Sequence, residues 1–397
     1  MNQNSSAAST QKKSVTKQKL LINPLTIVAG ELLLALPLGF LLAKLQIGGI
    51  AWIFGGIVAG VFVCQGYRVL CEYTPKPNRT ARKVGMALVG LTVGAANAPN
   101  HLVSLAAGLP IFVFLTFFML LCSMGIGYFY SRLSKTNILT AMLATVPGGV
   151  GVMSAIAADY NRNVSLVALV QAIRVTAVVV IIPFIAKTSV GNSWNLPILP
   201  AKLALISFDP VQIGLLLLIL AITALLVYLV KLGRIPAGDF FGALLIGIAI
   251  NPLLDILPFM GDIDFNPPIL IKLVGQMLLG ITIGEYWGDQ PNFEKQTLGY
   301  ALVSVAMTLI VGAIAAILAM KLTNWDWLTC LLVTAPGGSA EMILVALTLN
   351  HHVEIVTTGH IVRLIAINSS LPLWLFLFRR FDSFMEQTAH GIPHSRS

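Results

Sequence analysis

The sequence contains very little charge for a chain of 397 residues. Charged residues make up only 10% of it, whereas hydrophobic residues make up 57%, and the mean hydropathy is +0.86. A soluble globular protein carries about 25% charged residues. This scarcity of charge excludes a soluble fold and indicates a protein whose main partner is the lipid bilayer.

Cysteine and histidine are also scarce. The four cysteines include no Cys-x-x-Cys pair, which argues against a cysteine-based metal site. The six histidines include the group His351, His352 and His360, close to Glu354. A catalytic metal site normally has three convergent ligands with second-shell support, and the other half of the chain has no matching group. We therefore expect no metal, no cofactor and no enzymatic activity.

The basic residues give a net charge of +9 but form no separate domain. They lie in the tails and short loops, and we find no helix-turn-helix pattern, so we expect no nucleic-acid partner. Residues 1–20 carry four lysines among serine, threonine and glutamine, with no cleavage site after a short apolar core. We interpret this segment as a disordered cytoplasmic tail and not as a signal peptide.

Apolar sequence, in contrast, is abundant. Twelve stretches approach or exceed the about 20 residues that a helix needs to cross a hydrocarbon core. They are residues 25–42, 50–69, 84–98, 102–130, 138–158, 164–185, 211–230, 240–257, 269–286, 297–320, 327–349 and 355–378. The pattern predicts an all-α polytopic membrane protein.

The second half of the chain repeats the first. Residues 139–183 align without a gap with residues 328–372, and 15 of the 45 aligned positions are identical. The shared residues include a Pro-Gly-Gly triplet and an arginine inside an apolar segment, which apolar composition alone does not explain. Glycines at matching positions upstream, such as Gly90 and Gly280, are typical of helices whose backbones approach closely. A duplication that interrupts one apolar segment in each half is the pattern of a transporter with a central binding site.

The duplication divides the chain into two membrane repeats with short flanking segments. The expected units are the basic tail at 1–20, the first repeat at 21–187, a connector at 188–210, the second repeat at 211–380 and a cytoplasmic tail at 381–397.

Basic residues in short loops mark the cytoplasmic side of a membrane protein. Clusters follow the second, seventh and twelfth apolar stretches; their members are Arg68, Lys76, Arg79, Arg82 and Lys83, then Lys231 and Arg234, then Arg379 and Arg380. The first two clusters both mark the cytoplasmic side, and five stretches separate them. Returning to the same side takes an even number of crossings, so one of the five stretches does not cross. If the same stretch fails in both halves, each repeat has five crossings and the repeats are inverted, which gives about ten spanning helices in all.

The Pro-Gly-Gly segment is the best candidate for the stretch that does not cross. Its arms, residues 138–146 and 150–158, would each be about 13 Å long as helices, roughly half of the hydrocarbon core. Proline and glycine break the helix, and irregular backbone at that depth is tolerated only inside protein or beside an aqueous cavity. We predict a re-entrant hairpin in each half; a broken spanning helix is the alternative.

The strongest candidates for chemistry are two arginines inside apolar segments. Arg174 and Arg363 occupy equivalent positions near the centres of their segments. A buried arginine is costly unless it has a partner, so it marks a functional site by default. The alternative is structural: an ion pair, or a cap on the carbonyls that the helix break exposes.

The helix breaks and their neighbours would complete an anion site. Helix N-termini that follow a break offer free backbone donors to an anionic group. Glu341, which has no counterpart in the first half, could bind a coupling proton or sodium ion, or neutralise Arg363. The expected substrate-binding residues are Pro147, Gly148, Gly149, Gln171, Arg174, Pro336, Gly337, Gly338, Ser339, His360 and Arg363.

The duplicated triplet also resembles a known family. The flanks Leu139-Thr140 and Leu328-Thr329, the sequence of residues 334–342 and the downstream Arg363 are similar to the AbrB-duplication family of bacterial membrane proteins. The resemblance runs from about residue 25 to residue 380. Members are labelled as regulators of gene expression or as ammonia monooxygenases, and the family is distinct from the small soluble DNA-binding regulator of that name. The first half departs from the motif, because Val152 occupies the position of Glu341.

These observations together predict an inner-membrane secondary transporter for a small anionic solute. It would work by alternating access around the two Pro-Gly-Gly breaks, in a bacterial inner membrane, with both termini in the cytoplasm. A homo-oligomer is compatible with the sequence. The alternatives are a membrane sensor that influences gene expression without transport and, with less support, a membrane-embedded monooxygenase.

Overall fold

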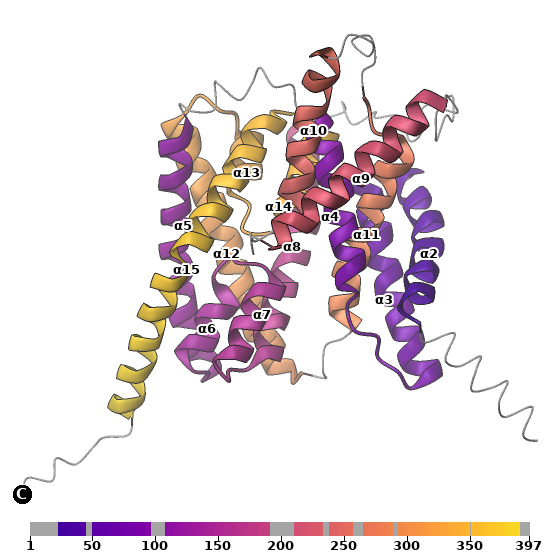
Figure 1. The fold of residues 1–397 in the computed structure, drawn as a ribbon. Helices are drawn as coiled ribbons and strands as arrows, with labels where there is room; N and C mark the ends of the chain where they lie inside the picture. Colours follow the sequence, from indigo (N-terminus) through magenta and orange to yellow (C-terminus); the bar gives the residue numbers. More distant parts are fainter. Residues whose placement is uncertain are drawn as a thin grey trace, which may run out of the picture.

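The computed structural model describes residues 23–44, 50–96, 108–190, 210–232, 238–256, 265–288, 293–349 and 351–389. Every regular element in these ranges is a helix, so the predicted all-α fold is confirmed (Figure 1). The predicted tail at 1–20 and most of the connector at 188–210 lie outside the described residues.

The helices follow the predicted apolar stretches. The first half contains α2 (Pro24–Lys44), α3 (Ala51–Cys71), α4 (Arg79–Ala96), α5 (Leu109–Ser134), α6 (Ile138–Thr145), α7 (Val150–Asp159) and α8 (Val164–Val190). The second half contains α9 (Pro210–Leu232), α10 (Gly238–Ile256), α11 (Ile269–Gly288), α12 (Lys295–Leu322), α13 (Trp327–Thr334), α14 (Ser339–Thr348) and α15 (Val353–Ala389).

Nine of the described helices are long and apolar enough to cross a membrane. The tenth predicted crossing is α4, an 18-residue helix with basic residues in its first turns that packs against α10 and α11. The chain is therefore a multi-pass membrane protein.

The two Pro-Gly-Gly segments are each split into two short helices. The helices α6 and α13 have 8 residues, and α7 and α14 have 10. The second segment returns to the side from which it started, because Asp326 just before α13 lies 2.8 Å from His351 just after α14. In Figure 1, α6 and α7 occupy the lower part of the protein and α13 and α14 the upper part, the placement that inverted repeats require.

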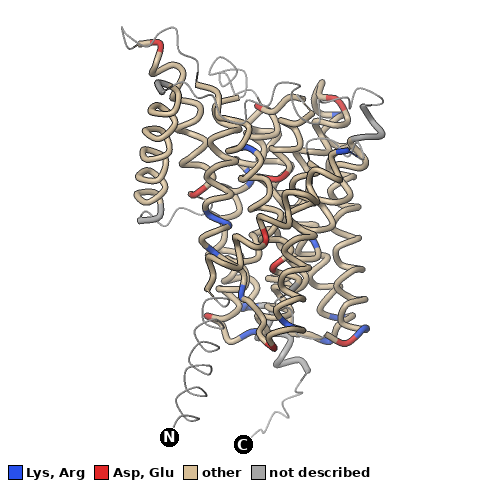
Figure 2. Tube along the Cα trace, turned by 90° about the vertical axis from the view of Figure 1, so that its right-hand side faces the viewer, with Lys and Arg blue, Asp and Glu red and all other residues tan. Residues whose placement is uncertain are grey.

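The charged residues are also distributed unevenly between the lower and upper ends of the protein. Figure 2 shows that lysine and arginine gather at the lower end, where the described part of α15 ends. The ring of Tyr160, which follows α7, lies beneath the guanidinium of Arg379 of α15 at 5.4 Å. The turn after the first hairpin is therefore at the end that the basic residues mark.

The helices form two bundles with different packing. The scaffold bundle contains α2–α4 and α9–α11, in which α3 packs along α11 and α4 along α10. The hairpin bundle contains α5–α8 and α12–α15. The bundles meet chiefly where α4 contacts α14 and α8 contacts α11.

Glycine makes the scaffold contacts possible. A Cβ atom added to Gly56 of α3 would collide with the Met277 carbonyl of α11, and one added to Gly280 would collide with the Ile53 carbonyl of α3. Gly94 of α4 and Gly247 of α10 form the equivalent contact. Small residues allow helices in lipid to gain dispersion energy by backbone approach, as the glycine spacing predicted.

Replacing a contact glycine should therefore separate the scaffold helices. We expect Gly56→Val to lower the melting temperature and broaden the size-exclusion peak of the detergent-solubilised protein, because overpacking costs about 1 to 3 kcal/mol or more. Gly66→Val in the same helix is the matched control, since no atom lies within 4 Å of its added Cβ. Equal effects of the two substitutions would refute the packing described here.

The inverted arrangement also predicts which residues react from each side. In a variant without the four native cysteines, Asn161→Cys and His352→Cys place thiols at exposed turns after α7 and α14. An impermeant maleimide should label them from opposite sides of the membrane in oriented vesicles. Labelling of both from one side would rule out inverted repeats.

Candidate functional site

Each helix break is held in place by a threonine, and the two threonines occupy equivalent positions in the repeats. In the first half the Thr145 hydroxyl donates to the carbonyl of Ser123 on α5, at 3.3 Å, as well as within α6. In the second half the Thr334 hydroxyl lies 3.0 Å from the Gly312 carbonyl of α12 and 2.8 Å from the Cys330 carbonyl. The equivalent threonines tie each break to the long helix beside it.

The glycines of the two triplets supply the turn. Gly149 has φ +81°, Gly337 +153° and Gly338 +63°, a backbone region that favours glycine. A Cβ at Gly148 would also overlap the side chain of Met153. Backbone geometry thus favours glycine at positions 149, 337 and 338.

Arg174 and Gln171 of α8 bind the carbonyls that the first break exposes. The Arg174 Nη1 donates to the Thr145 carbonyl at 3.0 Å, and its Nη2 donates to Gln171 Oε1 at 2.6 Å. The Gln171 amide in turn donates to the carbonyls of Leu143 and Val146, at 2.8 and 2.9 Å. Arg174 and Gln171 together satisfy the exposed carbonyls at the C-terminal end of α6.

Arg363 and His360 of α15 do the same at the second break. The Arg363 Nη1 donates to the Ala335 carbonyl at 2.6 Å, and its Nη2 lies 2.6 Å from His360 Nδ1. Because Nδ1 accepts from the guanidinium, the ring proton belongs on Nε2, which donates to the Leu332 carbonyl at 3.0 Å. Both arginines therefore perform the carbonyl-capping role that the sequence left open as an alternative.

Capping does not neutralise the two guanidinium charges. Among the described residues, neither Arg174 nor Arg363 has a carboxylate oxygen within 4.0 Å. Both side chains are buried, and the Nε of Arg174 has no hydrogen-bond partner. That Nε lies 3.4 Å from the position of a Cβ on Gly337. The arginine of the first repeat thus reaches the break of the second.

The helices that follow the breaks have glycine at the N-cap position, Gly149 in one and Gly338 in the other, which supplies no capping side chain. At the start of α14 the Glu341 carboxylate accepts from its own backbone N–H. The first backbone N–H groups of a helix have no partner inside it and carry its partial positive charge. Pro147 and Pro336 are buried, whereas the glycines of both triplets and Ser339 are half-buried. Helix starts with glycine N-caps and arginines without a carboxylate partner together favour an anion at this place.

Glu341 and Ser339 lie beside the second break. The Ser339 hydroxyl is 3.4 Å from Arg363 Nη2, a weak contact. Glu341 is buried, and its Oε2 lies 3.3 Å from the Cβ position of Gly338. No ion pair joins Glu341 to Arg363 within the described residues. Arg82 belongs to α4, which contacts α14, the helix that carries Glu341.

Arg82 is a site candidate that the sequence analysis missed. Its Nη1 donates to the Tyr286 hydroxyl of α11 at 3.1 Å and lies 3.7 Å from the Cβ position of Gly151 in α7. Arg82 therefore extends from the scaffold bundle toward the starts of both α7 and α14. The sequence showed it only as one basic residue of a cytoplasmic cluster, because nothing there revealed that α4 begins at Arg79.

A second missed feature is a pair of acids inside the scaffold bundle. Glu31 of α2 is 0% exposed, and neither of its carboxylate oxygens has a hydrogen-bond partner among the described residues. Glu285 of α11 is 1% exposed and accepts from the backbone N–H of Asn78 at 2.9 Å. The sequence signal was present, since each is a single acid in an apolar segment.

Because the Glu31 carboxylate has no hydrogen-bond partner in the described part of the chain, removing it should not destabilise the protein. We expect Glu31→Met to raise the free energy of unfolding by about 1 to 3 kcal/mol, the cost of an unsatisfied buried polar group. Thermal melting in detergent measures this, with the exposed Glu294→Gln as a neutral control. A clear loss of stability would instead show that Glu31 has a partner.

Comparisons with known proteins match most of the chain to one family. The family model described as "Transition state regulatory protein AbrB" matches residues 52–379. The chain is 28% identical over 344 residues to the Escherichia coli (strain K12) protein named "Putative regulator AbrB", covering 84% of this chain and 90% of that protein. It is 29% identical over 264 residues to the Bacillus subtilis (strain 168) protein named "Uncharacterized protein YhjN", covering 64% and 67%. With most of its length matched by the family model, this membrane protein belongs to the AbrB family.

Proposed function

We propose that this protein is a secondary transporter for a small anionic solute, which binds between the two Pro-Gly-Gly breaks. The observation that carries the proposal is the meeting of the repeats at one point. The Nε of Arg174, which has no hydrogen-bond partner among the described residues, lies against Gly337 of the opposite repeat, beside a helix whose N-cap is a glycine. A carboxylate or similar oxyanion would complete the hydrogen bonds of the arginine and the helix start.

The two bundles provide the parts that alternating access needs. Both breaks and both arginines belong to the hairpin bundle, and the scaffold bundle is held together by glycine contacts between backbones. Movement of the hairpin bundle against a rigid scaffold would expose the site to one side and then the other. The inverted placement of the hairpins gives each side an equivalent route to the centre.

Glu341 is the proposed carrier of the coupling ion. It is the acid next to the second break and lies at the junction of the bundles, where the charge of Arg82 acts on it. A proton or sodium ion on Glu341 would change its attraction to Arg82, so ion binding would alter the contact between α14 and α4. This links the ion to the movement.

A thermal-shift screen against organic and inorganic anions, followed by uptake into proteoliposomes, tests the proposal. We expect the wild-type protein to be stabilised by its anion and to take it up. Arg174→Lys and Arg363→Lys should bind about 10- to 100-fold more weakly, because each loses a charge-assisted hydrogen bond of about 1.5 to 3 kcal/mol. Arg132→Ala, at an exposed position of α5, should leave binding unchanged.

Glu341→Gln separates binding from coupling. The amide keeps the size of the side chain but carries no ion, so the variant should bind the anion and exchange it across the membrane, yet fail to accumulate it against its gradient. If no anion stabilises the wild-type protein, the arginines serve only to cap carbonyls and the transport proposal is wrong.

A membrane sensor is the second candidate, favoured by the regulator names of the family model and of the E. coli relative. It would use the same anion site, and binding would change the arrangement of the bundles for a partner. Anion-dependent stabilisation without any flux in proteoliposomes would select this function over transport. The bacterial inner membrane and the cytoplasmic termini form part of either proposal.

A further inference from the structure

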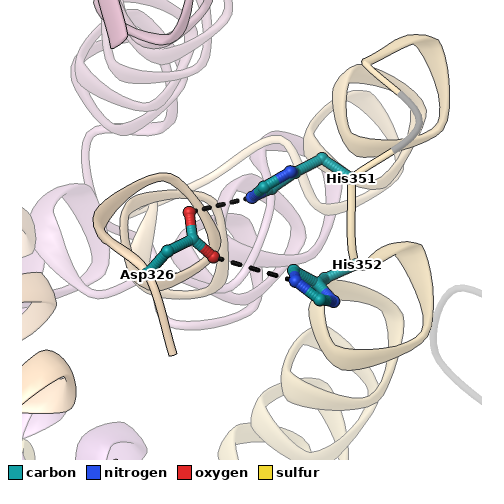
Figure 3. Close-up of side chains that lie close together, drawn as sticks. All are labelled: Asp326, His351 and His352. Carbon is teal, nitrogen blue, oxygen red and sulfur yellow. Dashed lines mark hydrogen bonds and ion pairs between the residues drawn. The ribbon is translucent and has the colours of Figure 1, made fainter. Parts of the chain in front are cut away.

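Three potential metal ligands converge at the mouth of the second hairpin. Asp326 precedes α13, and His351 and His352 lie in the turn between α14 and α15; Figure 3 shows both imidazole rings directed at the carboxylate. His351 Nε2 lies 2.8 Å from Asp326 Oδ2, and His352 Nε2 lies 4.0 Å from Oδ1. The three ligand atoms all lie within 4.8 Å of one another.

The carboxylate is held in place by bonds that do not involve the histidines. Asp326 is the N-cap of α13 and accepts from the backbone amides of Leu328 and Thr329, and from the Thr329 hydroxyl. The helix start therefore fixes the position of this ligand independently of the histidines.

The histidines are positioned by the turn and by a neighbouring acid. Adjacent residues normally point apart, but His352 has φ +39°, in the left-handed region, which brings its ring to the same side as His351. Its Nδ1 lies 3.5 Å from Glu354 Oε1, so Nε2 is left to face Asp326. A carboxylate behind a histidine is the second-shell support typical of metal-binding imidazoles.

We propose that Asp326, His351 and His352 bind a divalent transition-metal ion of the zinc class, with Glu354 as the second-shell partner. Two imidazoles and one carboxylate are borderline ligands that suit zinc, nickel or copper better than magnesium or calcium. Ligands about 2.0 to 2.2 Å from a tetrahedral ion lie about 3.3 to 3.5 Å apart, so small rotations of these partly exposed side chains would complete the geometry. Water would occupy the remaining position.

The site differs from the metal grouping that the sequence pattern raised. His360, one member of that grouping, is buried and bonded to Arg363, and its place is taken by Asp326, 25 residues before His351. In the first repeat the equivalent positions are Asn137, Arg162 and Asn163, which do not form such a ligand set. A bound ion would join the start of α13 to the turn before α15 and so clamp the mouth of one hairpin only.

Zinc titration of the full-length protein, purified without a histidine tag and treated with a chelator, tests the proposal. Calorimetry should give one Zn²⁺ per chain, and Co²⁺ should give visible absorption bands of imidazole coordination. His351→Gln, His352→Gln and Asp326→Asn should each weaken binding by at least about tenfold, and Glu354→Gln by about tenfold. Asparagine at 326 can still cap α13, so that variant is expected to fold.

The control removes two histidines elsewhere in the chain. His390→Gln with His394→Gln should bind zinc as the wild-type protein does, and His352→Gln should melt at the wild-type temperature when no metal is present. The proposal is overturned if the wild-type protein binds no zinc, if the four cluster variants bind it with unchanged affinity, or if only the His390 and His394 variant loses it. None of these outcomes depends on anion transport.

Discussion

The structure depends on how two broken helices satisfy their backbone carbonyls inside a membrane. A helix end buried at that depth has no water to accept from or donate to, and each unsatisfied group costs several kcal/mol. Arg174 with Gln171, and Arg363 with His360, supply the missing donors. The threonine at each break adds a bond to the adjacent long helix. These bonds allow the Pro-Gly-Gly turns to exist, and through them the hairpins keep their shape.

The same solution creates the conditions for function. Carbonyl dipoles at a helix C-terminus attract a cation but do not cancel its charge. Two capped breaks therefore bring two net positive charges into a region that also contains two helix N-termini with glycine N-caps. Each charge of the site thus has a structural cause, and an anion is the partner that we propose for it. The duplication explains why the features come in pairs.

The two repeats carry different residues at two equivalent positions near the breaks. Gln171 and His360 make equivalent hydrogen bonds to carbonyls before the breaks, so the difference in residue type between the repeats preserves the carbonyl cap. Val152 and Glu341 are not equivalent in chemistry, since only Glu341 places an acid beside a break and close to the charge of Arg82. In the proposed transport cycle, both repeats would contact the anion, whereas only the second would bind the proton or sodium ion.

The sequence predicted the helices, the duplicated breaks and the paired arginines, because these features rest on local signals: apolar length, helix-breaking residues and intramembrane charge. It did not predict Arg82, since the approach of α4 to α7 and α14 is set by packing between bundles. It did not group Asp326 with the histidines, because the hairpin fold brings them together across 25 residues. Glu31 was visible as a lone acid in an apolar segment, but its lack of a partner is a property of three-dimensional packing. The role of a residue can thus be predicted from the sequence when it depends on the residue's own segment. When the role depends on a distant segment, the fold is needed. In this protein Arg82 and the Asp326 group are of the second kind, and they lie where the two bundles and the two ends of a hairpin meet.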